Sequence, residues 1–183
     1  MDRRQSLIAV SALAGHALFP EVLKRFGEVQ AATAEAPNSW QPELLSVAQG
    51  QLLAEMVDTV IPETDTPGAK AARVHVFIDL LLKHCRSATE QDAFLKGLAA
   101  VDTRCRGFHT VGFIEASPVS REELLRRLDA DGDPFVRTLK QLAALGYCTS
   151  QVGATQALAY VAVPGEYEAC VDLKAGQKSW ATR

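Results

Sequence analysis

The chain has 183 residues and a formal net charge of -3 at pH 7, and 48% of its residues are hydrophobic. That hydrophobic share supplies a core for one globular domain, which excludes a chain that is disordered throughout. The acidic balance argues against a nucleic-acid-binding protein, because such proteins present a basic surface to phosphates.

The N-terminus has the pattern of an export leader. Arg3 and Arg4 precede a modest apolar run over residues 7–19. The run is too short for an ordinary transmembrane helix, so the pattern favours a signal peptide. The arginine pair resembles a twin-arginine leader, although Ser6 stands where such leaders commonly have phenylalanine.

We assign residues 1–34 to this twin-arginine-type signal peptide, or alternatively to an uncleaved N-terminal helix. Ala32-Thr33-Ala34 fits a cleavage site. The alternative rests on an amphipathic pattern in this segment. Its apolar side would hold Val22, Leu23 and Phe26. We expect membrane association to be only indirect, or through the leader where it is not cleaved. Residues 35–41 read as a linker, and residues 42–183 form the main domain, whose first helix is expected at about Pro42.

Two helical patterns flank one sharp break between residues 52 and 82. Apolar residues recur at three- and four-residue steps on both sides of the break. Pro62 ends the first helix, and the second cannot begin much before Pro67, because proline disfavours helix in the residue before it. Asp65 and Thr66 are candidate caps for the second helix. The sequence therefore predicts a helical hairpin with a stiff polar corner.

Three more helices are expected before residue 147. The capping-box spacing from Ser87 to Glu90 predicts a helix over about 89–105, followed by a loop over 107–113. Ser117-Pro118 starts a short helix, and Asp133-Pro134 starts another that Gly146 ends. The core side of that last helix would hold Phe135, Val136, Leu139, Leu142 and Leu145. The fold class is all-α, a compact bundle of about five to six helices with an extended tail from about residue 161.

Two stretches of the chain carry a family resemblance. Ile61-Pro62-Glu63-Thr64-Asp65-Thr66-Pro67-Gly68-Ala69, followed by Phe77-Ile78-Asp79, resembles the gluconate 2-dehydrogenase subunit 3 family. Residues 145–155 are similar to that family's GYxTSEIGAT stretch, with Cys148 and Gln151 as departures. With Val163-Pro164-Gly165 and the segment 177–181, the resemblance covers most of the chain after about Leu44.

The resemblance implies a non-catalytic accessory subunit of a dehydrogenase complex in the periplasm. In such complexes a large subunit of the glucose-methanol-choline type binds FAD and oxidises a sugar or sugar acid. A c-type cytochrome subunit can accept the electrons. The small subunit supplies the twin-arginine export signal and stabilises the large one, so the resemblance implies that this chain itself binds no cofactor.

Large aromatic residues punctuate the tail. Tyr160, Tyr167 and Trp180 stand in a segment with no helical period. Such side chains either fold back on the bundle or lie across a partner, since aromatic anchors suit both roles. We expect the tail with these residues, together with the helical face around the central hairpin, to contact the partner subunit.

Four cysteines form an even set in a chain with an export leader, so a disulfide is expected in at least one pair. The candidates are Cys85, Cys105, Cys148 and Cys170. Cys85 and Cys105 are one candidate pair because they bracket one predicted helix. Cys148 departs from the family pattern, and its alternative interpretation is a free, buried thiol.

No combination of residues predicts a catalytic, cofactor or metal site. Residues 129–133 begin like a calcium loop, but Pro134 and Lys140 stand where the loop needs glycine and glutamate, so a turn and helix cap is expected. His75 and His84 are too far apart along one helix to share a metal ion. A rival interpretation remains open, a free-standing periplasmic binding or structural protein that uses the same helical scaffold without a dehydrogenase partner.

Overall fold

The computed structural model describes residues 24–25, 27–29, 40–163, 165, 170, 172 and 174–182. Several predictions fall outside these residues. They are the arginine pair Arg3 and Arg4, the cleavage site at residues 32–34, the apolar side chains of Val22, Leu23 and Phe26, and the tail aromatic Tyr167.

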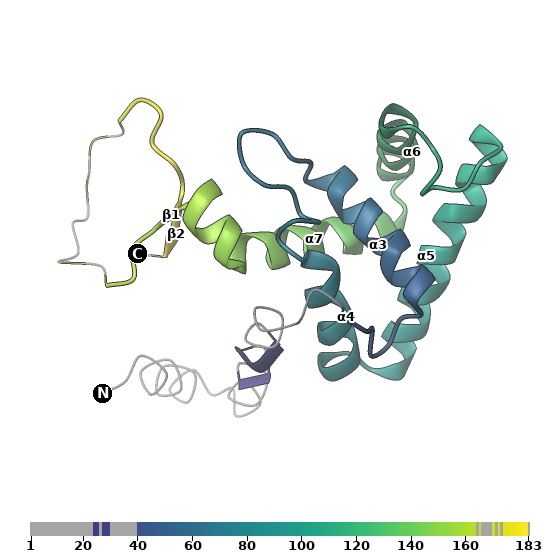
Figure 1. Ribbon diagram of the computed structural model, residues 1–183, viewed down its shortest axis with the longest axis horizontal. Helices are drawn as coiled ribbons and strands as arrows, with labels where there is room; N and C mark the ends of the chain where they lie inside the picture. The colour runs from purple at the N-terminus through teal and green to yellow at the C-terminus, as the bar shows by residue number, and fades with distance from the viewer. Residues whose placement is uncertain are drawn as a thin grey trace.

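The described chain is all-α apart from one short pair of strands, which confirms the predicted fold class (Figure 1). The elements are α3 (Val47–Val60), α4 (Val74–Cys85), α5 (Ala88–His109), α6 (Pro118–Ala130), α7 (Pro134–Thr149), the π-helical turn η1 (Gly153–Ala157), β1 (Ala159–Tyr160) and β2 (Trp180–Thr182). None of the described helices is both long enough and apolar enough to cross a bilayer.

Helix α4 lies at the centre of the core. It packs against α3 and α7, and all its residues from Val76 to Leu82 are buried. A helix that is apolar on every side is stable only when its neighbours cover it on every side. Figure 1 shows α5 and α6 at one end of the bundle, while α7 extends from the bundle towards the tail at the other end.

The helix starts follow local capping chemistry. The capping box predicted at Ser87 and Glu90 is present, and Ser117 and Asp133 cap α6 and α7 as expected. The first helix starts at Val47 rather than at about Pro42, because Ser46 and Gln49 form a second capping box there.

The start of α4 differs from the prediction. This helix begins at Val74 and does not include Pro67. Residues 69–73 form a turn instead, and Arg73 lies in the left-handed region with φ of 59°. Neither Asp65 nor Thr66 caps the helix, because its N-cap is Arg73 and no side chain makes a cap hydrogen bond there.

Two glycines that were expected to lie outside helices lie within them. Helix α5 continues through Gly107 to His109, so the predicted loop is shorter. Helix α7 continues through Gly146 to Thr149, because this glycine provides space for a neighbouring ring rather than a stop. Leu145, expected in the core, is 40% exposed.

The tail returns to the end of α7. Strands β1 and β2 pair in parallel, with Ala159 opposite Trp180. The backbone N–H of Ala159 donates to the carbonyl oxygen of Ser179 at 2.8 Å, and the ammonium of Lys178 donates to the carbonyl oxygen of Gln156. Figure 1 shows the two strands beside the end of α7, away from α5 and α6.

Candidate functional site

The two stretches that carry the family resemblance lie against each other. Tyr147, in the second stretch, is buried, and its hydroxyl donates to the carbonyl oxygen of Pro67 in the first stretch at 2.8 Å. Its hydroxyl also lies 3.4 Å from Oγ1 of Thr66. One hydrogen bond thus joins the polar corner to the end of α7.

Backbone contacts hold the corner between α3 and α4. The N–H of Ala69 donates to the carbonyl oxygen of Ile61 at 2.9 Å, and the N–H of Lys70 donates to Oδ1 of Asp58 at 3.1 Å. A side chain at Gly68 would place its Cβ only 2.8 Å from that same Oδ1. The corner therefore requires glycine at this position for its close approach.

The end of α7 is shaped by equally close contacts. A Cβ on Gly146 would lie 2.6 Å from Cδ1 of Phe77, and a Cβ on Gly153 would lie 1.9 Å from the carbonyl oxygen of Tyr147. The hydroxyl of Ser150 donates to that carbonyl oxygen at 2.7 Å and accepts from the N–H of Gly153 at 3.0 Å. The residues of the second stretch thus have structural roles.

A buried carboxylate fixes the segment before α3. Asp79 has no solvent exposure, and its oxygens accept from the backbone N–H groups of Glu43 at 2.8 Å, Leu44 at 3.2 Å and Leu45 at 2.9 Å. Sequence reasoning gave Asp79 no such role. The available signal was a single charged residue within an apolar helix, because a buried charge is retained only where it is fully hydrogen-bonded.

A second polar centre joins α3 to α6. Glu55 binds the ammonium of Lys70 and the guanidinium of Arg121, each at 2.5 Å. Arg121 also donates to the carbonyl oxygens of Phe113 and Ile114. Partial burial raises the pKa of Glu55, but the hydrogen bonds from the two cations outweigh this effect and the pKa is lowered overall.

The cysteines do not form the expected disulfide. All four are free thiols: Cys105 is buried, Cys85 is half-buried, and Cys148 and Cys170 are exposed. An α-helix rises about 1.5 Å per residue, so most of the length of α5 separates Cys85 from Cys105, well beyond disulfide reach. Burial raises the pKa of the Cys105 thiol. The alternative of a buried thiol at Cys148 is also wrong, because that residue is exposed.

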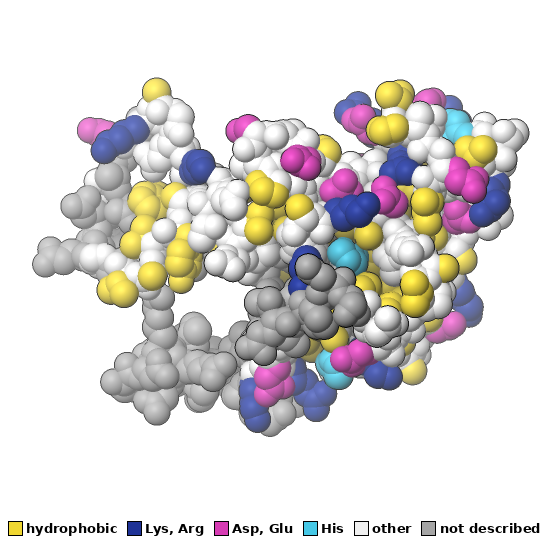
Figure 2. Space-filling model, in the orientation of Figure 1, with side chains coloured by type: hydrophobic (Ala, Val, Ile, Leu, Met, Phe, Trp, Pro, Cys, Tyr) yellow, Lys and Arg dark blue, Asp and Glu magenta, His cyan; other side chains and the backbone are white. Residues whose placement is uncertain are grey.

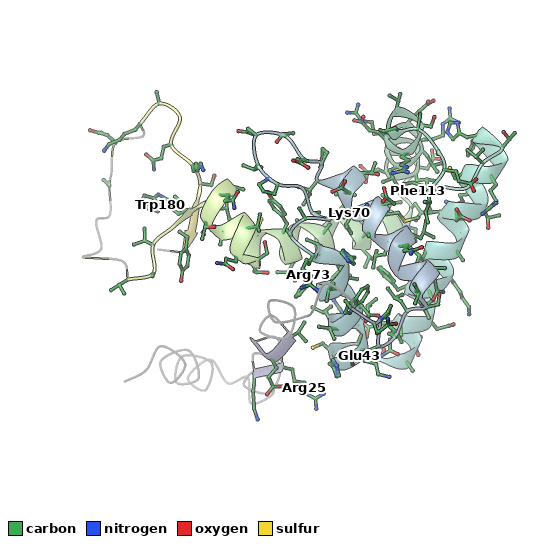
Figure 3. All side chains as sticks on the ribbon, viewed as in Figure 1. Arg25, Glu43, Lys70, Arg73, Phe113 and Trp180 are labelled. Atoms are coloured by element: carbon green, nitrogen blue, oxygen red, sulfur yellow. The ribbon has the colours of Figure 1, made fainter. Side chains whose placement is uncertain are left out.

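The predicted aromatic anchors occupy the two ends of the tail loop. Tyr160 is 47% exposed and Trp180 is 44% exposed. Val161 and Val163 add to them, so the tail holds four of the nine large hydrophobic side chains that are exposed in the described chain. Figure 3 shows Trp180 beyond the end of α7, on the opposite side of the molecule from Phe113.

The titratable residues that the structure describes do not form a metal centre. Within the described residues, no group of three or more His, Cys, Asp and Glu side chains could hold a metal ion. Nε2 of His84 lies 2.9 Å from Oε2 of Glu43. The His75 ring packs edge to face on the Trp40 ring, with 5.3 Å between the ring centroids. Asp133 caps α7 and pairs with Arg104, which confirms the expected cap at residues 129–133.

A comparison with protein families matches residues 47–165, more than half of the chain, to the family model described as gluconate 2-dehydrogenase subunit 3. The matched region runs from α3 to the tail and includes both stretches described above. No curated protein and no solved structure matches the chain.

Proposed function

The chain belongs to the gluconate 2-dehydrogenase subunit 3 family, and we propose that it is the non-catalytic accessory subunit of a periplasmic, FAD-dependent dehydrogenase complex of the gluconate or glucose type. Its partner is a large subunit that binds FAD and oxidises the substrate. In complexes of this type a c-type cytochrome subunit can accept the electrons.

The observation that carries this proposal is the exposed apolar surface of the tail. Tyr160 lies on β1 and Trp180 on β2, and these two strands pair with each other. Val161 and Val163 follow Tyr160 in the chain, and all four side chains are exposed. Aromatic side chains that are exposed in a cluster are typical of protein interfaces, where they become buried against a partner. We assign this surface, the tail surface, to the contact with the large subunit.

The leader supplies the second part of the proposed role. A flavoprotein that acquires FAD in the cytoplasm crosses the membrane folded, which suits the twin-arginine route. A large subunit without a leader would then be exported while bound to this chain, and Arg3 and Arg4 would direct the pair to the periplasm.

Replacing Tyr160 and Trp180 together by serine tests the contact. We expect the variant to recover at least ten times less flavoprotein in co-purification, because two aromatic anchors are lost from the tail surface. Val119→Ser is the matched control, since Val119 is 74% exposed but lies on α6, outside the tail surface. Undiminished recovery with the double variant would contradict the assignment.

A further inference from the structure

A groove of about 440 Å³ lies on the outer face of α3, away from the tail surface. Its base contains the small residues Gly50 and Ala54, one helical turn apart, and Trp40 and Ile114 stand among the residues around it. A Cβ on Gly50 would lie 3.2 Å from the Trp40 ring, so glycine lets the indole approach the helix closely.

The rim of the groove is apolar and exposed. Val47 is 56% exposed and Ile114 is 43% exposed, and both line the groove. Exposed apolar side chains around a concavity are typical of a binding surface rather than of ordinary protein surface. Figure 2 shows one face of the molecule, on which hydrophobic side chains lie beside charged side chains and histidines.

One end of the groove has an excess of positive charge. Lys70 and Glu55 line that end, and Glu55 is bound by Lys70 and Arg121. Oδ1 of Asp58 accepts from the backbone N–H of Lys70, and the charge of Arg73 acts on His75, so three cations stand against two carboxylates there. Burial, together with the charges of Arg73 and Lys70, lowers the pKa of His75 to about 4, so its ring is neutral at pH 7. The positive field at this end favours an acidic group over a basic one.

Two ring nitrogens beside the groove lack hydrogen-bond partners in the described part of the chain. They are Nε1 of Trp40 and Nδ1 of His75, and both are buried. The two rings meet edge to face with their centroids 5.3 Å apart. Because neither nitrogen is open to solvent, the two rings form a wall of the groove rather than hydrogen-bonding groups for an incoming segment.

We propose that this groove binds an extended segment of the large flavoprotein subunit that carries an apolar side chain next to an aspartate or glutamate. The apolar side chain lies between Val47 and Ile114, and the carboxylate pairs with Lys70. This second contact rests on the proposed function but uses none of the residues of the tail surface.

Charge placed in the groove tests the proposal. Ile114→Glu adds a carboxylate to the apolar rim, and Lys70→Glu reverses the charge at the positive end. The controls are Val119→Glu and Lys96→Glu, on side chains that are exposed and do not line the groove. The measurement is the affinity of each full-length variant for the isolated large subunit by biolayer interferometry, with thermal melting to confirm folding.

Each groove variant should weaken binding at least tenfold, while each control stays within twofold of the natural protein. Ile114→Glu removes no side-chain hydrogen bond, so it remains informative if Lys70→Glu unfolds. Hydrogen exchange at residues 47–54 should also slow when the complex forms.

Unchanged affinity in a folded Ile114→Glu variant, with no slowing of exchange, would overturn the groove proposal and leave the accessory role intact. Concentration-dependent self-association that this variant abolishes would identify a second copy as the occupant and would also overturn it. Absence of any complex with the natural chain would contradict the accessory role itself.

Discussion

Tyr147 of α7 donates its hydroxyl to the carbonyl oxygen of Pro67 at 2.8 Å. The two residues are 80 positions apart in the chain, and each belongs to one of the two stretches that carry the family resemblance. One contact between the polar corner and the end of α7 therefore joins the two stretches in this chain.

Tyr147→Phe removes this hydrogen bond and keeps the ring in place. We expect the free energy of unfolding to fall by about 1 kcal/mol, the net value of a typical hydrogen bond, with the helix content unchanged. Urea denaturation followed by circular dichroism measures the change. An unaltered urea midpoint would show that the contact does not stabilise the corner.

Gly146→Ala and Gly107→Ala should have opposite effects, although both glycines lie in helices. A Cβ at position 146 would lie 2.6 Å from Phe77, whereas one at 107 meets nothing within 4 Å. Overpacking typically costs about 1–3 kcal/mol, while alanine in an open helix position gains up to about 1 kcal/mol. Thermal melts of the two variants should shift in opposite directions. A shift in the same direction would refute the packing role of Gly146.

Asp79→Ala should be strongly destabilising. The variant leaves the N–H groups of Glu43, Leu44 and Leu45 without their acceptor. We expect a loss of about 3 kcal/mol or more, and a smaller loss for Asp79→Asn, which keeps one carbonyl oxygen. Asp92→Ala is the control on an exposed ion pair and should change stability by less than about 1 kcal/mol. Equal denaturation midpoints for Asp79→Ala and the control would contradict the anchoring role.

His75 should make the fold sensitive to mild acid. Its pKa is about 4 in the folded chain and 6.5 without the fold, because burial and the charges of Arg73 and Lys70 oppose the protonated form. The unfolded chain then binds the proton first, so stability is highest above pH 6.5 and falls as the pH drops towards 4.

The full effect has an upper limit of about 3 kcal/mol, from about 1.4 kcal/mol for each unit of pKa. Urea midpoints at pH 7 and pH 5 measure the part of this loss that develops above pH 5. Glu55, whose pKa is lowered from 4.5, loses its contribution mainly at lower pH. His75→Gln should reduce the difference between the two midpoints. An unchanged difference in His75→Gln would show that the ring is not held neutral.

Local chemistry made the helices predictable from the sequence. Pro62 ends α3, and the capping box at Ser87 starts α5, because these effects depend on neighbouring residues alone. The start of α4 at Val74 was not predictable in this way. It depends on a turn that is held by contacts to Asp58 and Ile61 from the preceding helix.

The candidate site was predictable only in part. Tyr160 and Trp180 could be chosen from the sequence as candidate partner contacts, since the tail has no helical period, and the structure adds that both are exposed. The pairing expected between Cys85 and Cys105 was wrong because the length of α5 separates them. The groove beside Trp40 and Ile114 could not be foreseen, because its residues come together only when α3, the corner and the 110–117 segment pack.

The central claim is that this chain carries a flavoprotein, and one measurement tests it most directly. The tagged full-length protein is purified from the periplasmic fraction of its native host under conditions that preserve complexes. Its visible absorption spectrum is recorded together with a mass-spectrometric identification of the proteins that accompany it. We predict a flavin spectrum and one large subunit in equal amount. A colourless protein recovered alone would contradict the accessory role.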